Sequence, residues 1–114
     1  MSEMDVHVVG RHLEIAPELR AAVLAKVTKV GRFAADVRRV DVDFAETEAR
    51  RAEDRTSCEV LVHVNRHLVK ATAHAPAPLP ALDRALAKVE QQLRRLHDRR
   101  TDKLASRRDG GPGR

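Results

Sequence analysis

Apolar and polar residues alternate along four short stretches of the chain, a pattern typical of half-buried β-strands. Valine, Phe or Cys occupies every second position in the two longest of them. Asn65-Arg66-His67 predicts a tight turn between the last two strands. The later strands therefore form two consecutive antiparallel hairpins. The predicted strands are residues 4–9, 38–46, 56–65 and 68–74.

Two other stretches repeat apolar residues every three or four positions, as amphipathic helices do. Pro17 and Glu18 suit a first helical turn, so the first helix is expected over residues 17–33. The proline-rich segment 75–80 ends the last strand, and a second helix is expected from Pro80 to about Lys103. The apolar stripes are Leu19, Val23, Val27 and Val30 on the first helix, and Leu82, Leu86, Val89, Leu93 and Leu96 on the second.

The order β-α-β-β-β-α predicts an α+β fold, a four-stranded sheet with two helices packed on one face. A chain of 114 residues is long enough for one core and too short for two. We expect that domain to occupy residues 1–103. Residues 104–114 end in Gly110-Gly111-Pro112-Gly113 and predict a disordered basic tail.

Aromatic residues are scarce, and this narrows the functions to consider. Phe33 and Phe44 are the only two, with no Trp or Tyr. Many single-strand binders stack bases on exposed rings, so this chain would have to recognise nucleic acid through phosphates and shape. The chain has no apolar run near the ~20 residues that span a membrane, and no signal-peptide core. The sequence thus predicts a cytoplasmic protein without a membrane partner.

Positive charge is concentrated in the predicted helices. The net charge is +5, with +3 in residues 17–33, +5 in residues 79–114 and −3 in the remainder. One edge of the first helix is basic, and on the second helix four basic residues fall within about 60° of one another, opposite the leucines. Such rows suit phosphate binding, although a merely solvated helix face remains an alternative. The candidate RNA-binding residues are Lys26, Lys29, Arg32, Arg84, Lys88, Arg95 and Arg99.

Cys58 is the only cysteine, which excludes an intramolecular disulfide and a CxxC-type zinc site. It alternates with the valines of its strand, so we expect a small buried core residue. Glycines 110, 111 and 113 follow no strand and form no phosphate-binding loop. We find no Ser-His-Asp or Cys-His signature, and therefore expect no catalytic residues, no cofactor and no small-molecule substrate.

Two polar groups remain as weak candidates for metal chemistry. His63 and His67 suggest a metal pair, with His74, Glu59 or Asp54 as further ligands, but the pattern does not make three ligands converge. Ordinary surface histidines are the favoured interpretation, so no metal site is predicted. The acidic row of Asp41, Asp43 and Glu46 is interpreted as serving solubility and protection of a sheet edge.

Three segments, in register with the predicted elements, resemble the ribosome hibernation promoting factor family, also called ribosome-associated translation inhibitors. They are MDVHVVGRHLEIAPELR at residues 4–20, AKVTKVGRF at 25–33 and ALDRALAKVEQQLRRL at 81–96. The resemblance implies a domain in the decoding channel of the small ribosomal subunit. There it would contact 16S-type rRNA, exclude messenger and transfer RNA, and inhibit translation under stress.

The resemblance also marks site residues and departures. Lys26, Lys29 and Arg32, with Lys88 and Arg95, match the family's basic positions on the two helices. Gln91 stands where relatives often have a basic residue, and Leu79 where an aromatic is common. Long members add a C-terminal domain that pairs ribosomes. This chain resembles a short form or an isolated N-terminal domain, expected to be a monomer off the ribosome.

Two other classes of function stay open at this point. A general double-stranded RNA-binding protein or RNA chaperone would bind any duplex with similar affinity. A protein-interaction module would instead expose the leucine stripe of residues 82–96 to a partner helix. The predicted fold buries that stripe against its own sheet.

Overall fold

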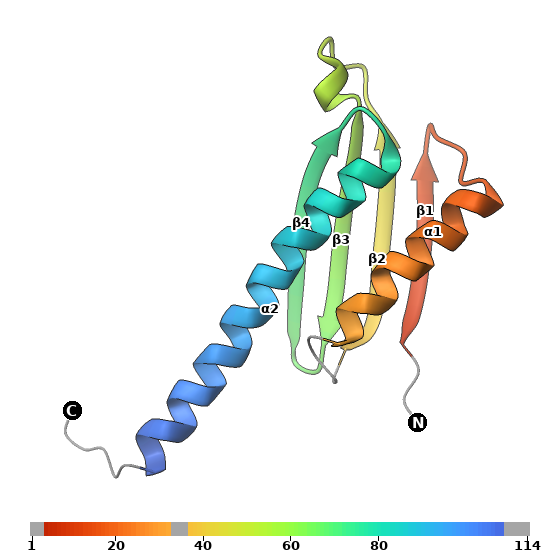
Figure 1. The fold of residues 1–114 in the computed structure, drawn as a ribbon. Helices are drawn as coiled ribbons and strands as arrows, with labels where there is room; N and C mark the ends of the chain where they lie inside the picture. The colour runs from red at the N-terminus through yellow and green to blue at the C-terminus, as the bar shows by residue number, and fades with distance from the viewer. Residues whose placement is uncertain (1–3, 33–36, 109–114) are drawn as a thin grey trace.

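The computed structural model describes residues 4–32 and 37–108, and within these the side chains of residues 4–30 and 37–96. Two helices lie across a single sheet (Figure 1). The elements are β1 (Asp5–Arg11), α1 (Pro17–Thr28), the 3-10 turn η1 (Lys29–Arg32), β2 (Val37–Glu46), the 3-10 turn η2 (Ala52–Asp54), β3 (Thr56–Val64), β4 (His67–Ala75) and α2 (Pro78–Arg108).

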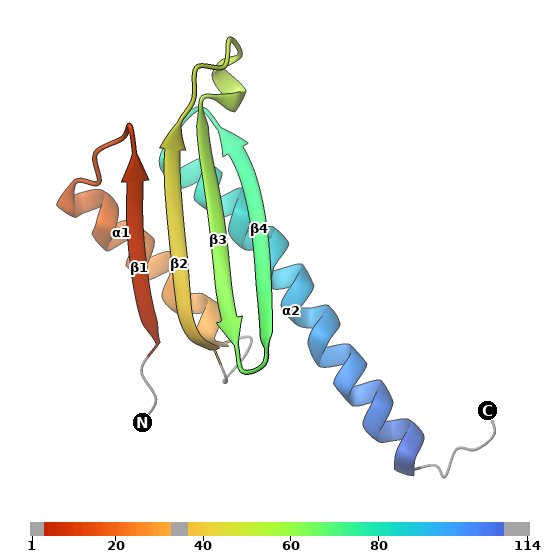
Figure 2. The same cartoon turned by 180° about the vertical axis from the view of Figure 1, so that it is seen from behind.

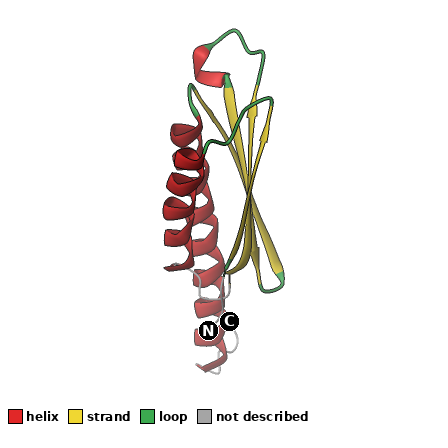
Figure 3. Ribbon diagram, turned by 90° about the vertical axis from the view of Figure 1, so that its right-hand side faces the viewer, coloured by secondary structure: helices red, strands yellow, loops and turns green. Residues whose placement is uncertain are grey.

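The sheet has the strand order β1-β2-β3-β4. β1 and β2 are parallel and joined through α1, whereas β2, β3 and β4 form two antiparallel hairpins. Both helices cover the same face of the sheet, and the other face is open (Figures 2 and 3). The predicted α+β fold and its β-α-β-β-β-α order are confirmed.

Both helices have bounds that differ from the prediction. α1 ends at Thr28 and the chain tightens into η1, while Phe33, expected at the helix end, lies outside the described residues. α2 begins at Pro78 and runs to Arg108, so residues 104–108, expected in the tail, are helical. The rest of that expected tail, 109–114, lies outside the described residues. Within the described ranges, no helix has the length and apolar character needed to cross a membrane.

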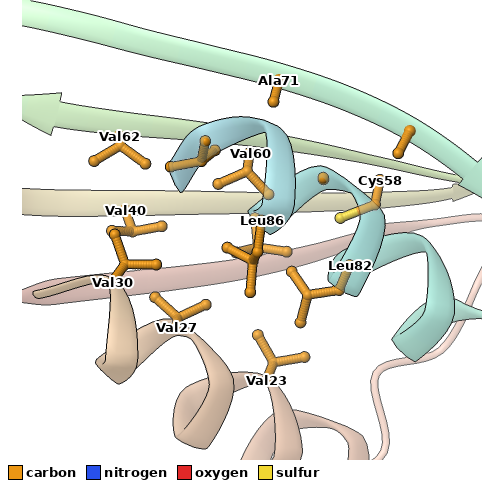
Figure 4. Close-up of a cluster of buried hydrophobic side chains, with 14 of the residues drawn as sticks. Val23, Val27, Val30, Val40, Cys58, Val60, Val62, Ala71, Leu82 and Leu86 are labelled. Carbon is orange, nitrogen blue, oxygen red and sulfur yellow. The ribbon is translucent and has the colours of Figure 1, made fainter. Parts of the chain in front are cut away.

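The core is a layer of aliphatic side chains between the covered sheet face and the helices. Val23 and Val27 of α1 and Val30 of η1 reach toward Val40 in β2 and Val60 in β3 (Figure 4). Leu82, Leu86, Val89 and Leu93 supply the α2 side, and only Leu96 of the predicted stripe is half-buried. The leucine stripe therefore packs on the chain's own sheet, which argues against a partner-binding helix face.

Cys58 lies fully buried in this layer, as the alternation predicted. Burial raises the pKa of its thiol to about 12, with smaller contributions from Asp43 and Glu59. A thiol that stays protonated is a poor nucleophile. Cys58 is thus a packing residue.

Gly10 allows the chain to turn back tightly after β1. A Cβ at this position would overlap the carbonyl oxygen of Leu13 and press on the side chain of Ile15. The turn also holds His12 at a positive φ of 59°. The connection from β1 to α1 therefore needs a residue without a side chain.

We predict that Gly10→Ala lowers the free energy of unfolding by about 1–3 kcal/mol, because backbone must shift to admit the methyl group. Urea denaturation followed by circular dichroism measures the change. Val9→Ala, at a neighbouring exposed position, is the control and should cost much less. Equal stability of Gly10→Ala and the parent chain would show that the turn adapts freely.

Candidate nucleic-acid interface

Lys26 of α1 forms an ion pair with a carboxylate of α2. Its Nζ lies 2.9 Å from Oδ1 of Asp83 in α2, and its side chain is 34% exposed. The sequence predicted Lys26 on the basic edge of the first helix, and the periodicity gave no sign of its acidic partner, because Asp83 comes from the other helix. The cation lies in the seam between α1 and α2.

Lys29 and Arg95 are the two candidates without an ion pair or hydrogen bond among the described side chains. Both are exposed. Neither side chain makes a hydrogen bond or ion pair with the part of the chain that the structure describes. Arg32 and Arg99 belong to η1 and α2, but their side chains lie outside those described.

Arg84 and Lys88 contact the outer edge of the sheet. Arg84 Nη1 donates to the carbonyl oxygen of His74 at 2.6 Å, and Lys88 Nζ to that of Thr72 at 2.7 Å. Gln92 Nε2 continues the series to the carbonyl oxygen of Lys70 at 2.8 Å. We call these three bonds the carbonyl ladder. Arg84 also lies 3.6 Å from a carboxylate oxygen of Glu53 in η2.

The carbonyl ladder follows from matched spacings. Four residues of helix rise about 6.0 Å and two residues of strand about 6.8 Å, so donors four apart meet acceptors two apart. Three outward carbonyls of edge strand β4 are thereby occupied, which hinders strand addition along that part of the edge. A carbonyl does not neutralise a cation, so Lys88 keeps its positive charge on this flank of α2, whereas Arg84 also has the Glu53 carboxylate beside it.

The helical wheel had placed Arg84 and Lys88 opposite the leucines. In the structure their flexible side chains bend toward β4, whereas Lys26 lies in the seam with α1. Lys26 of the predicted first row and Arg84 and Lys88 of the second thus lie on opposite flanks of α2. Gln92 was not among the predicted site residues, although it follows Lys88 by four residues, the same spacing as Arg84 to Lys88.

The open sheet face neutralises its own charges. Arg11 of β1 makes a bidentate pair with Asp43, at 3.2 and 2.9 Å. Asp41 contacts both Arg39, at 2.9 Å, and His63, at 3.1 Å, and Lys70 lies 3.4 Å from Glu59. This face consequently offers little net charge to a phosphate backbone.

The acidic row of Asp41, Asp43 and Glu46 does not protect an edge, because β2 is an interior strand. Asp41 and Asp43 instead pair with side chains of the sheet, Asp41 with Arg39 and His63, and Asp43 with Arg11. Burial raises the pKa of Asp41, but hydrogen bonds from Arg39 and His63 outweigh it and hold the pKa below its usual 3.8. Among the described residues no three His, Cys, Asp or Glu side chains are placed to hold a metal ion.

A mixed four-stranded sheet with two basic helices on one face defines a small α+β domain with one cationic layer. Residues 6–101 match the sequence profile of the family described as Sigma 54 modulation protein / S30EA ribosomal protein. The match extends over most of the chain. The chain belongs to this family.

Two curated relatives are both named ribosome hibernation promotion factor. That of Mycobacterium tuberculosis is 31% identical over 102 residues, and that of Deinococcus radiodurans 26% over 103 residues. These alignments cover 87% and 90% of this chain but only 46% and 52% of the relatives. The chain thus spans about half the length of these curated relatives.

Two solved structures share the fold. The N-terminal domain of Protein Y from Thermus thermophilus has a TM-score of 0.69 at 24% identity, and covers 82% of this chain and 99% of its own. A ribosomal subunit interface protein from Coxiella burnetii has a TM-score of 0.71 at 16% identity, with coverage of 83% and 99%. At these identities the likeness concerns the fold alone.

We predict that Lys26→Glu destabilises the protein, because it sets a second carboxylate beside Asp83. The expected coupling between the two positions is at most about 1 kcal/mol, since the pair is partly exposed. A double-mutant cycle by thermal unfolding, with Asp83→Lys as the second change, measures it. If the double variant with reversed charges recovers no stability, Lys26 and Asp83 do not form the ion pair between the helices.

We predict that Asp41 contributes to the pH dependence of stability. Its pKa is lowered in the folded protein, so the contribution is present above pH 3.8 and is lost as the pH falls through the folded pKa. Urea denaturation at pH 6 and pH 3 should show a smaller loss of stability for Asp41→Asn than for the parent chain. Asp5→Asn, exposed at the start of β1, is the control and should behave like the parent.

Proposed function

We propose that this chain is a ribosome hibernation factor that binds rRNA in the decoding channel of the small subunit. Bound there, it excludes messenger and transfer RNA and inhibits translation under stress. Membership in the family and the names of the curated relatives support the ribosome as partner. The observation that supports RNA binding by the helix layer is the difference in how the basic side chains of the two faces are paired.

That contrast is one of paired and unpaired charge. Cations on the open sheet face meet carboxylates within the same sheet, at Arg11, Arg39 and Lys70. On the helix layer Lys26 and Arg84 also have carboxylate partners. In the described residues, however, Lys29 and Arg95 have none, and Lys88 is bonded only to a carbonyl. Phosphates supply the missing anions, and their binding requires no aromatic ring.

The proposed mechanism is steric occlusion, without catalysis. The described residues bring together no metal-ligating cluster, and the thiol of Cys58 is buried. Seven side chains are proposed to contact rRNA. Of these, Lys29 and Arg95 are proposed to bind phosphate directly, Arg84 and Lys88 to do so while keeping their bonds to β4, and Lys26 to contact RNA from the seam, beside Asp83. Arg32 and Arg99 complete the proposed set.

We predict that binding to vacant small subunits weakens steeply with salt. If about six phosphates are engaged, affinity falls about a thousandfold between 50 and 200 mM salt. Co-sedimentation with an excess of unrelated duplex RNA measures it. Loss of binding to the competitor would favour a general double-stranded RNA-binding protein, and affinity that ignores salt would contradict phosphate binding.

We predict that the double variant Lys29→Glu with Arg95→Glu lowers the slope of log affinity against log salt by about two, one for each phosphate that the protein no longer neutralises. Thermal unfolding should barely change, because both side chains are exposed. Arg50→Glu with Arg51→Glu, exposed between β2 and η2, makes the same change in net charge. An equal loss in that control would mean that net charge, and not the helix layer, drives binding.

A further inference from the structure

The carbonyl ladder stops at Gln92, which binds the carbonyl of Lys70, one step short of the first residues of β4. The next position at the same spacing on α2 is Leu96, which has no donor to offer. On β4 the corresponding residue is Leu68, two before Lys70. Since alternate residues of an antiparallel strand direct their backbone groups to the same side, the N–H and C=O of Leu68 point to the outer edge with those of Lys70. The three donors of the carbonyl ladder bind the carbonyls of His74, Thr72 and Lys70 and do not reach that of Leu68.

A hollow of about 200 Å³ lies at this point, between the first residues of β4 and the middle of α2. Leu68 is 58% exposed, the highest value among the exposed large hydrophobic residues described, and Leu96 is half-buried. Arg95, exposed and without an ion pair in the described residues, stands beside them. The lining residues are His67, Leu68, Val69, Gln92, Arg95 and Leu96.

The chemistry of the hollow favours one class of ligand. Leu96 offers an apolar side chain, the outward backbone of Leu68 offers one donor and one acceptor, and Arg95 offers a cation. None of the lining residues is acidic. A nucleotide combines the complementary groups, namely a ring with apolar faces, an edge of donors and acceptors, and a phosphate. The volume is below the roughly 300 Å³ of a pocket for a drug-sized molecule, and so suits a single base.

We propose that this hollow holds one unpaired nucleotide of rRNA, with its base against Leu96 and the edge of β4 and its phosphate on Arg95. The proposal rests on the proposed function and adds a requirement to it. Phosphate contacts along the helix layer accept paired and unpaired RNA alike, whereas a base stacked within a duplex cannot enter a hollow. The hollow therefore selects a loop or bulge of the rRNA.

The first test maps what lies against the hollow in the complex. Because Cys58 is buried and its pKa is raised to about 12, a thiol introduced by Leu68→Cys is the reactive one and takes a photoreactive label. Val9→Cys, 53% exposed on the opposite edge strand, is the matched control. The labelled chains are irradiated on vacant small subunits, and the linked positions are sequenced. We expect position 68, and not position 9, to link to an unpaired nucleotide.

The second test changes the charge of the hollow. Leu68→Asp places a carboxylate beside the proposed phosphate and should weaken binding to small subunits about tenfold, the size of effect that one good base contact has. Val9→Asp, 53% exposed on the opposite edge strand, makes the same change in net charge and should leave affinity within about twofold. Both positions are exposed, so both variants should fold; circular dichroism checks this.

The outcomes separate the two proposals. Links from position 68 to paired rRNA or to a ribosomal protein, or equal affinities of Leu68→Asp and the parent chain, overturn the nucleotide site while rRNA binding stands. Absence of any binding by the parent chain overturns the proposed function and the nucleotide site together.

Discussion

The packing of small branched side chains between one sheet face and two helices is the interaction on which the rest of the structure depends. Without Trp or Tyr, and apart from Phe44, Cys58 and Thr56, the core is built from valines, alanines and leucines, so helices and sheet lie close together. Only one face of the sheet is covered in this way (Figure 3). The polar sides of both helices are consequently presented as one layer.

Several basic side chains of this layer have structural partners. Lys26 joins α1 to α2, and Arg84 and Lys88 close the edge of β4. Their bonds differ in what they leave for an anion. A carboxylate partner, as for Lys26, cancels most of the charge, whereas a carbonyl partner, as for Lys88, fixes the side chain and keeps its charge. Preorganised cations bind at a smaller cost in side-chain entropy than mobile ones.

The strands, helices and core of this protein could be predicted because they follow from local periodicity. Val40, Val60 and Leu82 are buried where the alternation and the heptad-like spacing placed them. The partners of the basic residues could not be predicted, because Lys26 and Asp83 lie far apart in sequence and no period links them. Local periodicity does not predict the order of strands in the sheet either. For this reason Asp41 and Asp43 were assigned to a sheet edge and not to an interior strand.

The single parallel pairing in the sheet has a consequence for folding. β3 and β4 are joined by a tight turn, and β2 and β3 by the local segment 47–55, so both hairpins close with a smaller loss of chain entropy than the pairing of β1 with β2. β1 meets β2 only after the chain has passed through α1, a contact between residues more than thirty positions apart. Non-local contacts form late and open first. We therefore expect β1 to join the sheet last, and its amide protons to exchange with solvent sooner than those of β3, which has a paired strand on each side.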